Sequence, residues 1–270
     1  MKKGLALIVS LFLTFLLALT GCGASQSEGT SGSGKGVKTL KVATDAAYAP
    51  FESLENGKIV GFDVDLVNAA AKEAGYKANV VNVGWDPLFV EIKEKKSDLA
   101  VSAITITDDR KQTYDFSVPY YLSTNEILVP ENSTISSGAD LKGKTVAVQN
   151  ATTGQEVAES ILGKNSPHIK KFKNNNLAIM ELLNGGADAV IADNGVVDTY
   201  VKNNPDKKLK IIKDDSFPME FYGLMFPKGS DLKADFDKAI QKLIDNGKYT
   251  EIYKKWFGTE PDLEKLKQGK

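Results

Sequence analysis

Short apolar runs alternate with longer stretches of helical periodicity along most of the chain. Strand-like runs are expected at Thr39 to Ala43, Lys77 to Val83 and Leu99 to Val101. Between them, Leu66 to Ala74 has the apolar spacing of a helix, which Gly75 ends. This alternation of strand and helix favours α/β lobes with mostly parallel sheets flanked by helices.

The pattern restarts after a strand-like run at Glu126 to Val129. In the second half, Asp188 to Asp193 (DAVIAD) echoes Asp98 to Ala103 (DLAVSA), so two similar lobes are expected. The further predicted elements are strands at Thr145 to Val148, Leu209 to Ile212 and Tyr222 to Phe226, and helices at Gln155 to Leu162, Leu177 to Leu183, Asp231 to Ile244 and Tyr249 to Trp256.

Composition narrows the class of protein. The chain has 270 residues, of which 42% are hydrophobic and 26% charged, and this suits one or two domains with real cores. The formal net charge of -1 does not indicate the excess of basic residues that nucleic-acid-binding proteins carry.

The N-terminus has the pattern of a secretion signal. Lys2 and Lys3 precede an apolar run from Leu5 to Leu19, too short for a comfortable membrane span. The following Leu19-Thr20-Gly21-Cys22 resembles a bacterial lipobox, in which a lipidated Cys becomes the first mature residue. We expect a signal peptide over 1–21, then lipidated Cys22 and a Gly/Ser-rich tether over 22–37. The alternative is an ordinary secretory peptide with an incidental Cys.

The stretch from Asp98 to Arg110 carries the first candidate chemistry. Its apolar run is followed by the hydroxyl-bearing residues Ser102 and Thr105 and then by Arg110. Ligands of open α/β sheets sit at the carboxyl ends of strands, and an arginine fork with hydroxyl donors suits a carboxylate. The same residues could equally be a capped turn with a solvated arginine.

Loops after other predicted strands add polar and aromatic groups. Asp45 and Tyr48 suit a ligand with a charged and an apolar part, or they could cap a turn and fill the core. Trp85, in a strand-to-helix loop, could stack on a ligand or be buried. Asp63 and Asp65 are interpreted as first-turn acids that favour the helix dipole.

The second lobe offers complementary groups. Thr152 and Thr153 stand at a helix start, where backbone N–H groups attract anions. Asp193 ends a strand and suits an ammonium group, although a helix-cap role explains it as well. No pattern in the sequence predicts a metal site or a cofactor.

Several motifs together resemble the polar amino-acid-binding proteins of ABC importers, bacterial solute-binding family 3. They are GFDVDLVNAAAKEA, ATDAAYAPF, SAITITDDR, GKTVAV and NGKYTEIYKKWFG, and the similarity spans Thr39 to about Pro261. The resemblance implies a two-lobed type II periplasmic-binding-protein fold with the ligand in the cleft between the lobes. Lobe 1 would comprise 38–124 and 221–260, lobe 2 125–220, and a charged tail 261–270.

The resemblance also implies a role for each candidate side chain. Arg110 would bind the ligand's α-carboxylate, helped by Thr105 and the Thr152 to Thr153 loop. Asp193 would bind the α-ammonium together with Ser102 or the backbone at Ala103. Tyr48 and Trp85 would sandwich the ligand's side chain, and Asp45 would meet its polar end. Gln149 and Ala192 stand where glutamine-binding relatives are expected to carry basic residues, and this favours a basic amino acid over glutamine.

The function implied is therefore that of a monomeric binding protein, lipid-anchored on the extracytoplasmic face of the membrane, that delivers arginine, lysine or histidine to a permease. Glutamine or another polar amino acid is the alternative ligand. A cyclohexadienyl-dehydratase-like enzyme on the same fold is the rival class, but it needs a general acid beyond Asp45 and Asp193. No catalytic residue is predicted.

Overall fold

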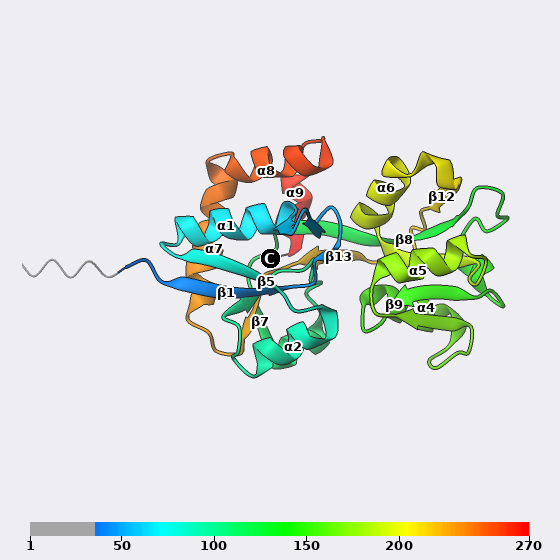
Figure 1. Cartoon of the computed structure of the whole chain (residues 1–270), viewed down its shortest axis with the longest axis horizontal. Helices are drawn as coiled ribbons and strands as arrows, with labels where there is room; N and C mark the ends of the chain where they lie inside the picture. The colour runs from blue at the N-terminus through cyan, green and yellow to red at the C-terminus, as the bar shows by residue number, and fades with distance from the viewer. Residues whose placement is uncertain (1–35, 270) are drawn as a thin grey trace, which may run out of the picture. The chain divides into compact units, whose positions relative to one another are not determined.

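Two larger β-sheets organise residues 36–269, the part of the chain that the computed structural model describes (Figure 1). The predicted signal peptide and Cys22 lie outside these residues. The first lobe's sheet has the strand order β5 (Lys77–Asn82), β1 (Thr39–Thr44), β6 (Leu99–Ala100), β14 (Met225–Pro227), β7 (Tyr114–Phe116). The second lobe's sheet has the order β10 (Ile169–Phe172), β9 (Val146–Gln149), β11 (Ala189–Asp193), β8 (Tyr121–Pro130), β12 (Leu209–Ile212).

The two sheets share one pairing pattern. In each, the first three strands in spatial order are parallel, and the remaining pairs are antiparallel. The strands β6 and β11, which carry the two similar sequence segments, occupy the same third position. The predicted similarity of the two halves is thus confirmed at the level of topology.

Two strands connect the lobes. The long strand β8 pairs at its beginning with β13 (Met219–Tyr222), in antiparallel register from Tyr121 opposite Tyr222 to Thr124 opposite Met219. Further along, β8 pairs with β11 and β12 inside the second sheet. The chain therefore enters the second lobe along β8 and returns along β13, as Figure 1 shows.

Helices cover both faces of each sheet. Successive residues of a strand point to opposite faces, so each strand contributes side chains to two separate cores. In β1, Val42 packs with helices α1 (Phe62–Glu73), α7 (Leu232–Asp245) and α8 (Lys248–Phe257), whereas Ala43 packs with α2 (Trp85–Lys93). In β9, Val148 belongs to the core under α4 (Thr153–Leu162), and Ala147 to the core under α5 (Asn175–Leu183) and α6 (Asn194–Asn203).

Smaller elements complete the fold. Strands β2 (Ala47–Tyr48), β3 (Glu52–Glu55) and β4 (Lys58–Val60) form a small sheet. Its Asn56-Gly57 turn has φ of 50° and 77°, the left-handed conformation that this pair of residues favours in a hairpin turn. The other short elements are helices α3 (Asp108–Thr113) and α9 (Leu263–Leu266) and single 3-10 turns at Gly138–Leu141, Pro205–Lys207 and Lys267–Gly269.

The structure differs from the sequence-based expectations at two places near the C-terminus. The run Tyr222 to Phe226 is divided between β13 and β14, and a Cβ added at Gly223 would lie 2.9 Å from Ile106 Cδ1. The expected charged tail contains α9, whose Leu266 is buried in the first lobe's core. A search of residues 36–269 finds no helix with the length and apolarity of a membrane span.

Candidate functional site

The ends of equivalent strands in the two lobes converge on one cavity. Asp45 directly follows β1, and Gln149 ends β9, which holds the same second position in its own sheet. Ser102 lies just beyond β6, and Asp193 ends β11 in the equivalent third position. The shared topology of the lobes therefore brings Asp45 and Gln149 into contact and places Ser102 and Asp193 at the same cavity.

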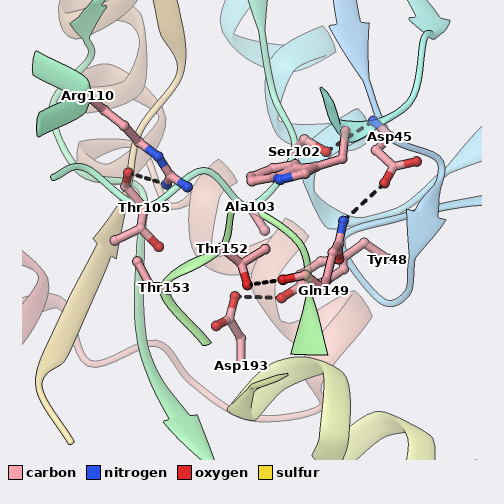
Figure 2. Close-up of a pocket in the computed structure, with 11 residues that line it drawn as sticks. Asp45, Tyr48, Ser102, Ala103, Thr105, Arg110, Gln149, Thr152, Thr153 and Asp193 are labelled. Carbon is pink, nitrogen blue, oxygen red and sulfur yellow. Dashed lines mark hydrogen bonds between the residues drawn. The ribbon is translucent and has the colours of Figure 1, made fainter. Parts of the chain in front are cut away.

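Every side chain chosen from the sequence for ligand binding lines this cavity. These side chains surround about 310 Å³ of empty space, part of which is open to solvent. Figure 2 shows Arg110 and Asp45 on opposite sides of the group, with Asp193 between and below them. The lining residues are Asp45, Tyr48, Trp85, Ser102, Ala103, Thr105, Arg110, Gln149, Thr152, Thr153 and Asp193.

Arg110 is held by contacts from both lobes. It lies in the first turn of α3, whose N-cap Thr107 accepts a hydrogen bond from the Arg110 backbone N–H. Its guanidinium donates to the carbonyl of Thr105 at 2.8 Å and to that of Ala151 in the second lobe at 3.3 Å. Its Cζ also lies 5.5 Å from the centre of the Trp85 ring. The oriented fork retains further N–H donors for an anion.

Asp193 is the negative counterpart. Its Oδ2 accepts hydrogen bonds from the hydroxyls of Tyr48 at 2.6 Å and Tyr222 at 2.5 Å. It occupies the N-cap position of α6 but makes no side-chain cap hydrogen bond, so the helix-cap alternative does not describe it. Burial raises the pKa of its carboxyl, while the tyrosine hydrogen bonds and Arg110 oppose that rise. A ligand ammonium would supply the missing positive partner.

Ser102 is fixed as a hydrogen-bond acceptor. Its hydroxyl donates its single proton to Glu52 Oε1 at 2.8 Å and accepts the Asp45 backbone N–H at 3.0 Å. The remaining lone pair is therefore suited to an ammonium group. Glu52, fully buried in β3, went unnoticed in the sequence because nothing there indicates that this hairpin residue turns inward.

Asp63 shapes the same loop from behind. It is fully buried, and its Oδ2 accepts the Ala103 backbone N–H at 2.7 Å and the Tyr120 hydroxyl at 2.8 Å. Ala103 has a φ of 47°, a conformation that non-glycine residues adopt only at a cost. The interpretation of Asp63 as a first-turn dipole acid was therefore incomplete: this carboxylate supports the loop that carries the site.

Glu52 and Asp63 form a buried acid pair. Burial, followed by the neighbouring Asp63 charge, raises the pKa of Glu52 well above its ordinary value, and burial raises the pKa of Asp63 to about 6. Among residues 36–269, Glu52 Oε2 and Asp63 Oδ1 have no other hydrogen-bond partner. A proton on Glu52 that is shared with Asp63 satisfies both atoms.

The far end of the pocket is formed by Asp45 and Gln149. The Gln149 amide donates to Asp45 Oδ2 at 3.5 Å, which joins the two lobes, and burial raises the pKa of Asp45. Gln149 Oε1 is buried without a hydrogen-bond partner in the described part of the chain. Two acceptors, one of them charged, are thus available at this end.

Trp85 and the two threonines lie at helix starts. Trp85 is the first residue of α2, not a loop residue as expected, and is buried against Phe89 with ring centres 4.8 Å apart. Thr152 is the N-cap of α4, and Thr153 begins the helix, two residues earlier than predicted. The hydroxyls of Thr153 and Thr105 both donate to Glu220, another buried carboxyl that the sequence did not reveal.

Comparison with known proteins identifies the family to which the chain belongs. Residues 40–259 match the bacterial extracellular solute-binding proteins, family 3. The chain belongs to this family. A probable histidine-binding protein of Neisseria gonorrhoeae is 40% identical over 247 residues, which is 90% of this chain and 92% of the relative.

Solved structures of the same type agree with this assignment. The arginine-, lysine-, histidine-binding protein ArtJ of Geobacillus stearothermophilus is 59% identical, with a TM-score of 0.84, over 86% of this chain and all of that one. An ancestral arginine-binding protein bound to glutamine is 39% identical, with a TM-score of 0.77, over 82% of this chain and 98% of that one.

Membership of family 3 makes the chain a solute-binding protein and not an enzyme. The two-lobed fold expected from the sequence is confirmed by the same comparisons. A search of residues 36–269 finds no group of His, Cys, Asp or Glu side chains that could hold a metal ion.

Proposed function

We propose that the protein captures a basic L-amino acid in the interlobe pocket and delivers it to the permease of an ABC importer. The core of the proposal is a pair of opposite charges. Arg110 offers a charged fork for the α-carboxylate, and Asp193 with the lone pair of Ser102 offers acceptors for the α-ammonium. Hydrogen bonds to charged groups contribute about 1.5 to 3 kcal/mol each.

The observation that carries the choice of ligand is the Asp45 and Gln149 pair. A guanidinium or ammonium side chain has only donors to offer, and this end of the pocket presents the Asp45 carboxylate and the unpartnered Gln149 Oε1. The rings of Tyr48 and Trp85 also line the cavity, and aromatic rings suit a flat cation. The names of ArtJ and the Neisseria relative support the same class of ligand.

Glutamine is the second candidate. Its side-chain amide could donate to Asp45 and accept from the Gln149 amide, and the ancestral arginine-binding protein was solved with glutamine bound. Glutamine leaves the Asp45 charge uncompensated in a buried site, so it should bind less tightly than arginine.

The place of action is proposed from the N-terminal sequence. Cleavage before Cys22 and lipidation of that residue would hold the protein on the extracytoplasmic face of the membrane, with 23–37 as a tether. We propose that it works there as a monomer, because each ligand group has its partner within this chain.

A thermal-shift panel of the common L-amino acids tests the function. A ligand that binds only the folded state at about 100 times its Kd stabilises it by about 2.7 kcal/mol, so arginine, lysine or histidine should raise the Tm by about 5 °C or more. Glutamine should give a smaller rise. No shift with any amino acid would refute the proposal.

The variant Arg110→Ala is the control for the binding mode. It removes the fork and leaves Asp45 and Asp193 in place, so the shift should disappear for every amino acid. A basic amino acid that still shifts this variant by the wild-type amount would mean that Arg110 does not bind the α-carboxylate.

A further inference from the structure

Glu220 is a buried carboxyl that connects the two lobes beneath the pocket. It lies in β13, one of the strands that join the lobes, and is 6% exposed. Its Oε2 accepts the hydroxyls of Thr105 in the first lobe at 2.8 Å and Thr153 in the second at 2.9 Å. Its Oε1 accepts the Asn125 amide at 2.8 Å. The two threonine hydroxyls that face the pocket are thus tied to a single carboxyl.

This arrangement conflicts with the role expected of the two threonines. A hydroxyl has one proton, and both Thr105 and Thr153 direct theirs at Glu220. The Asn125 amide occupies one lone pair of Thr153 at 3.4 Å, and the lone pairs that remain on both threonines repel a carboxylate. Ser102 presents a lone pair for the same reason, but there the expected partner is an ammonium.

We propose that Glu220 is a positioning residue that takes up a proton when the ligand's α-carboxylate binds. The proton comes from solvent and is added to Glu220 Oε2, which then donates to one threonine oxygen. That threonine turns its own hydroxyl proton toward the ligand carboxylate. This inference rests on the proposed function, since it concerns how the same pocket binds the α-carboxylate.

A second groove gives solvent protons access to Glu220. Thr105 and Thr153 line both this groove and the ligand pocket, and Glu220 lines the groove. The groove is also lined by Met219, which is 58% exposed, and by Glu156 of α4. The proton can therefore arrive without crossing the occupied pocket.

The charges around Glu220 favour the proton. Burial, followed by the neighbouring Asp193 charge, raises the pKa of Glu220 to about 7, while its threonine hydrogen bonds and Arg110 act in the opposite direction. Tyr48 also feels the Glu220 charge, and Glu156 adds a further negative group along the groove. A bound α-carboxylate would add another negative charge and strengthen proton uptake.

Calorimetry of arginine binding in buffers of different ionisation enthalpy measures this uptake directly. At about pH 7.5 the wild-type protein should take up on the order of half a proton per arginine bound, and Glu220→Gln should take up none. Normal arginine binding without proton uptake would overturn the inference and leave the proposed function intact. If no amino acid binds at all, both the inference about Glu220 and the proposed function are contradicted.

The pH profile separates this role from a merely structural one. Between about pH 6 and 8 the wild-type affinity should fall roughly threefold to tenfold, since an ionised Glu220 withholds both hydroxyls. Glu220→Gln should bind with a flat profile, because an NH2 group in the place of Oε2 donates to the threonine oxygens while Oε1 still accepts the Asn125 amide. A profile in Glu220→Gln that falls like the wild type's would contradict the inference.

Two further variants serve as controls. Glu126, in β8, is another buried carboxyl with a raised pKa, but it pairs with Lys213 outside the pocket. Glu126→Gln should therefore keep the wild-type proton uptake. Glu220→Ala removes the group that orients the two threonine hydroxyls, so it should bind about tenfold more weakly than wild type at about pH 6, with a flat pH profile. If Glu220 positions the two threonines, Glu220→Gln should bind arginine more tightly than Glu220→Ala does. Equal weakening in both variants would contradict this role.

Discussion

Arg110 and Asp45 illustrate which site residues a sequence can reveal. Each follows a recognisable apolar strand, and strand ends are where a sheet of this kind binds its ligand. Glu220 and Glu52 gave no such signal, because a carboxyl within a short strand resembles any surface acid until its partners are known. Those partners are remote: Thr105 is 115 positions from Glu220, and Ser102 is 50 from Glu52.

The variant Asp45→Asn tests the choice of ligand at the scale of one residue. The charge that would pair with a cationic side chain is lost while the shape is retained, so arginine affinity should fall about tenfold to a hundredfold. Glutamine, which needs no charge there, should lose less than about threefold. Calorimetric titration with both ligands measures the difference.

Asp86→Asn provides the matched control for this prediction. Asp86 is an exposed acid in the first turn of α2 that receives a long hydrogen bond of 3.5 Å from Asn150, and its charge contributes to the raised pKa of Asp45. Its removal should change arginine affinity by less than about twofold. Similar losses for arginine and glutamine in Asp45→Asn would instead argue that the ligand's cation lies elsewhere.

Helix α1 shows how a single element can combine two kinds of acid. Asp63 and Asp65 stand two residues apart in its first turn, and sequence alone treats them alike. In the structure Asp63 points inward to the Ala103 backbone, whereas Asp65 forms an ion pair with Lys255 of α8 at 2.6 Å. Helical periodicity predicted helix α1 itself. It could not predict the contact between Asp63 and the loop at Ala103, which lies 40 positions further along the chain.

Substitution of the two acids should therefore have unequal effects on stability. Asp63→Ala leaves the Ala103 N–H and the Tyr120 hydroxyl without their acceptor and should lower the free energy of unfolding by about 3 kcal/mol. Asp65→Ala removes a partly exposed pair and should cost about 1 kcal/mol. Urea unfolding of both variants measures the costs, and equal values would restore the dipole interpretation of Asp63.

For the whole molecule, the topology was more predictable than the connections between lobes. The DLAVSA and DAVIAD segments indicated two similar lobes, and each proved to be the third strand of an equivalently ordered sheet. Contacts across the cleft, such as Tyr48 to Asp193, involve residues 145 positions apart. They depend on how β8 and β13 place one lobe against the other, which no local pattern specifies.

Two buried acids, Glu220 between the lobes and Asp63 inside the first lobe, should make the stability of the whole protein depend on pH. Glu220 and Asp63 have pKa values raised to about 7 and about 6, so the folded state holds protons that the unfolded chain has released. Stability must then fall as the pH rises through this window, and Glu52, whose pKa burial also raises, adds to the fall. Carboxyls with lowered pKa values, such as Asp214, titrate below the window and do not oppose this trend.

Urea unfolding without ligand between about pH 5 and 8 tests this dependence. The free energy of unfolding should decrease by about 4 kcal/mol across the range, and Glu220→Gln should lose a substantial part of that slope because the amide cannot ionise. A basic amino acid at saturating concentration should raise the whole curve, since it binds the folded state. Stability that increases with pH in the wild-type protein would show that Glu220 and Asp63 are ionised in the folded state throughout this range.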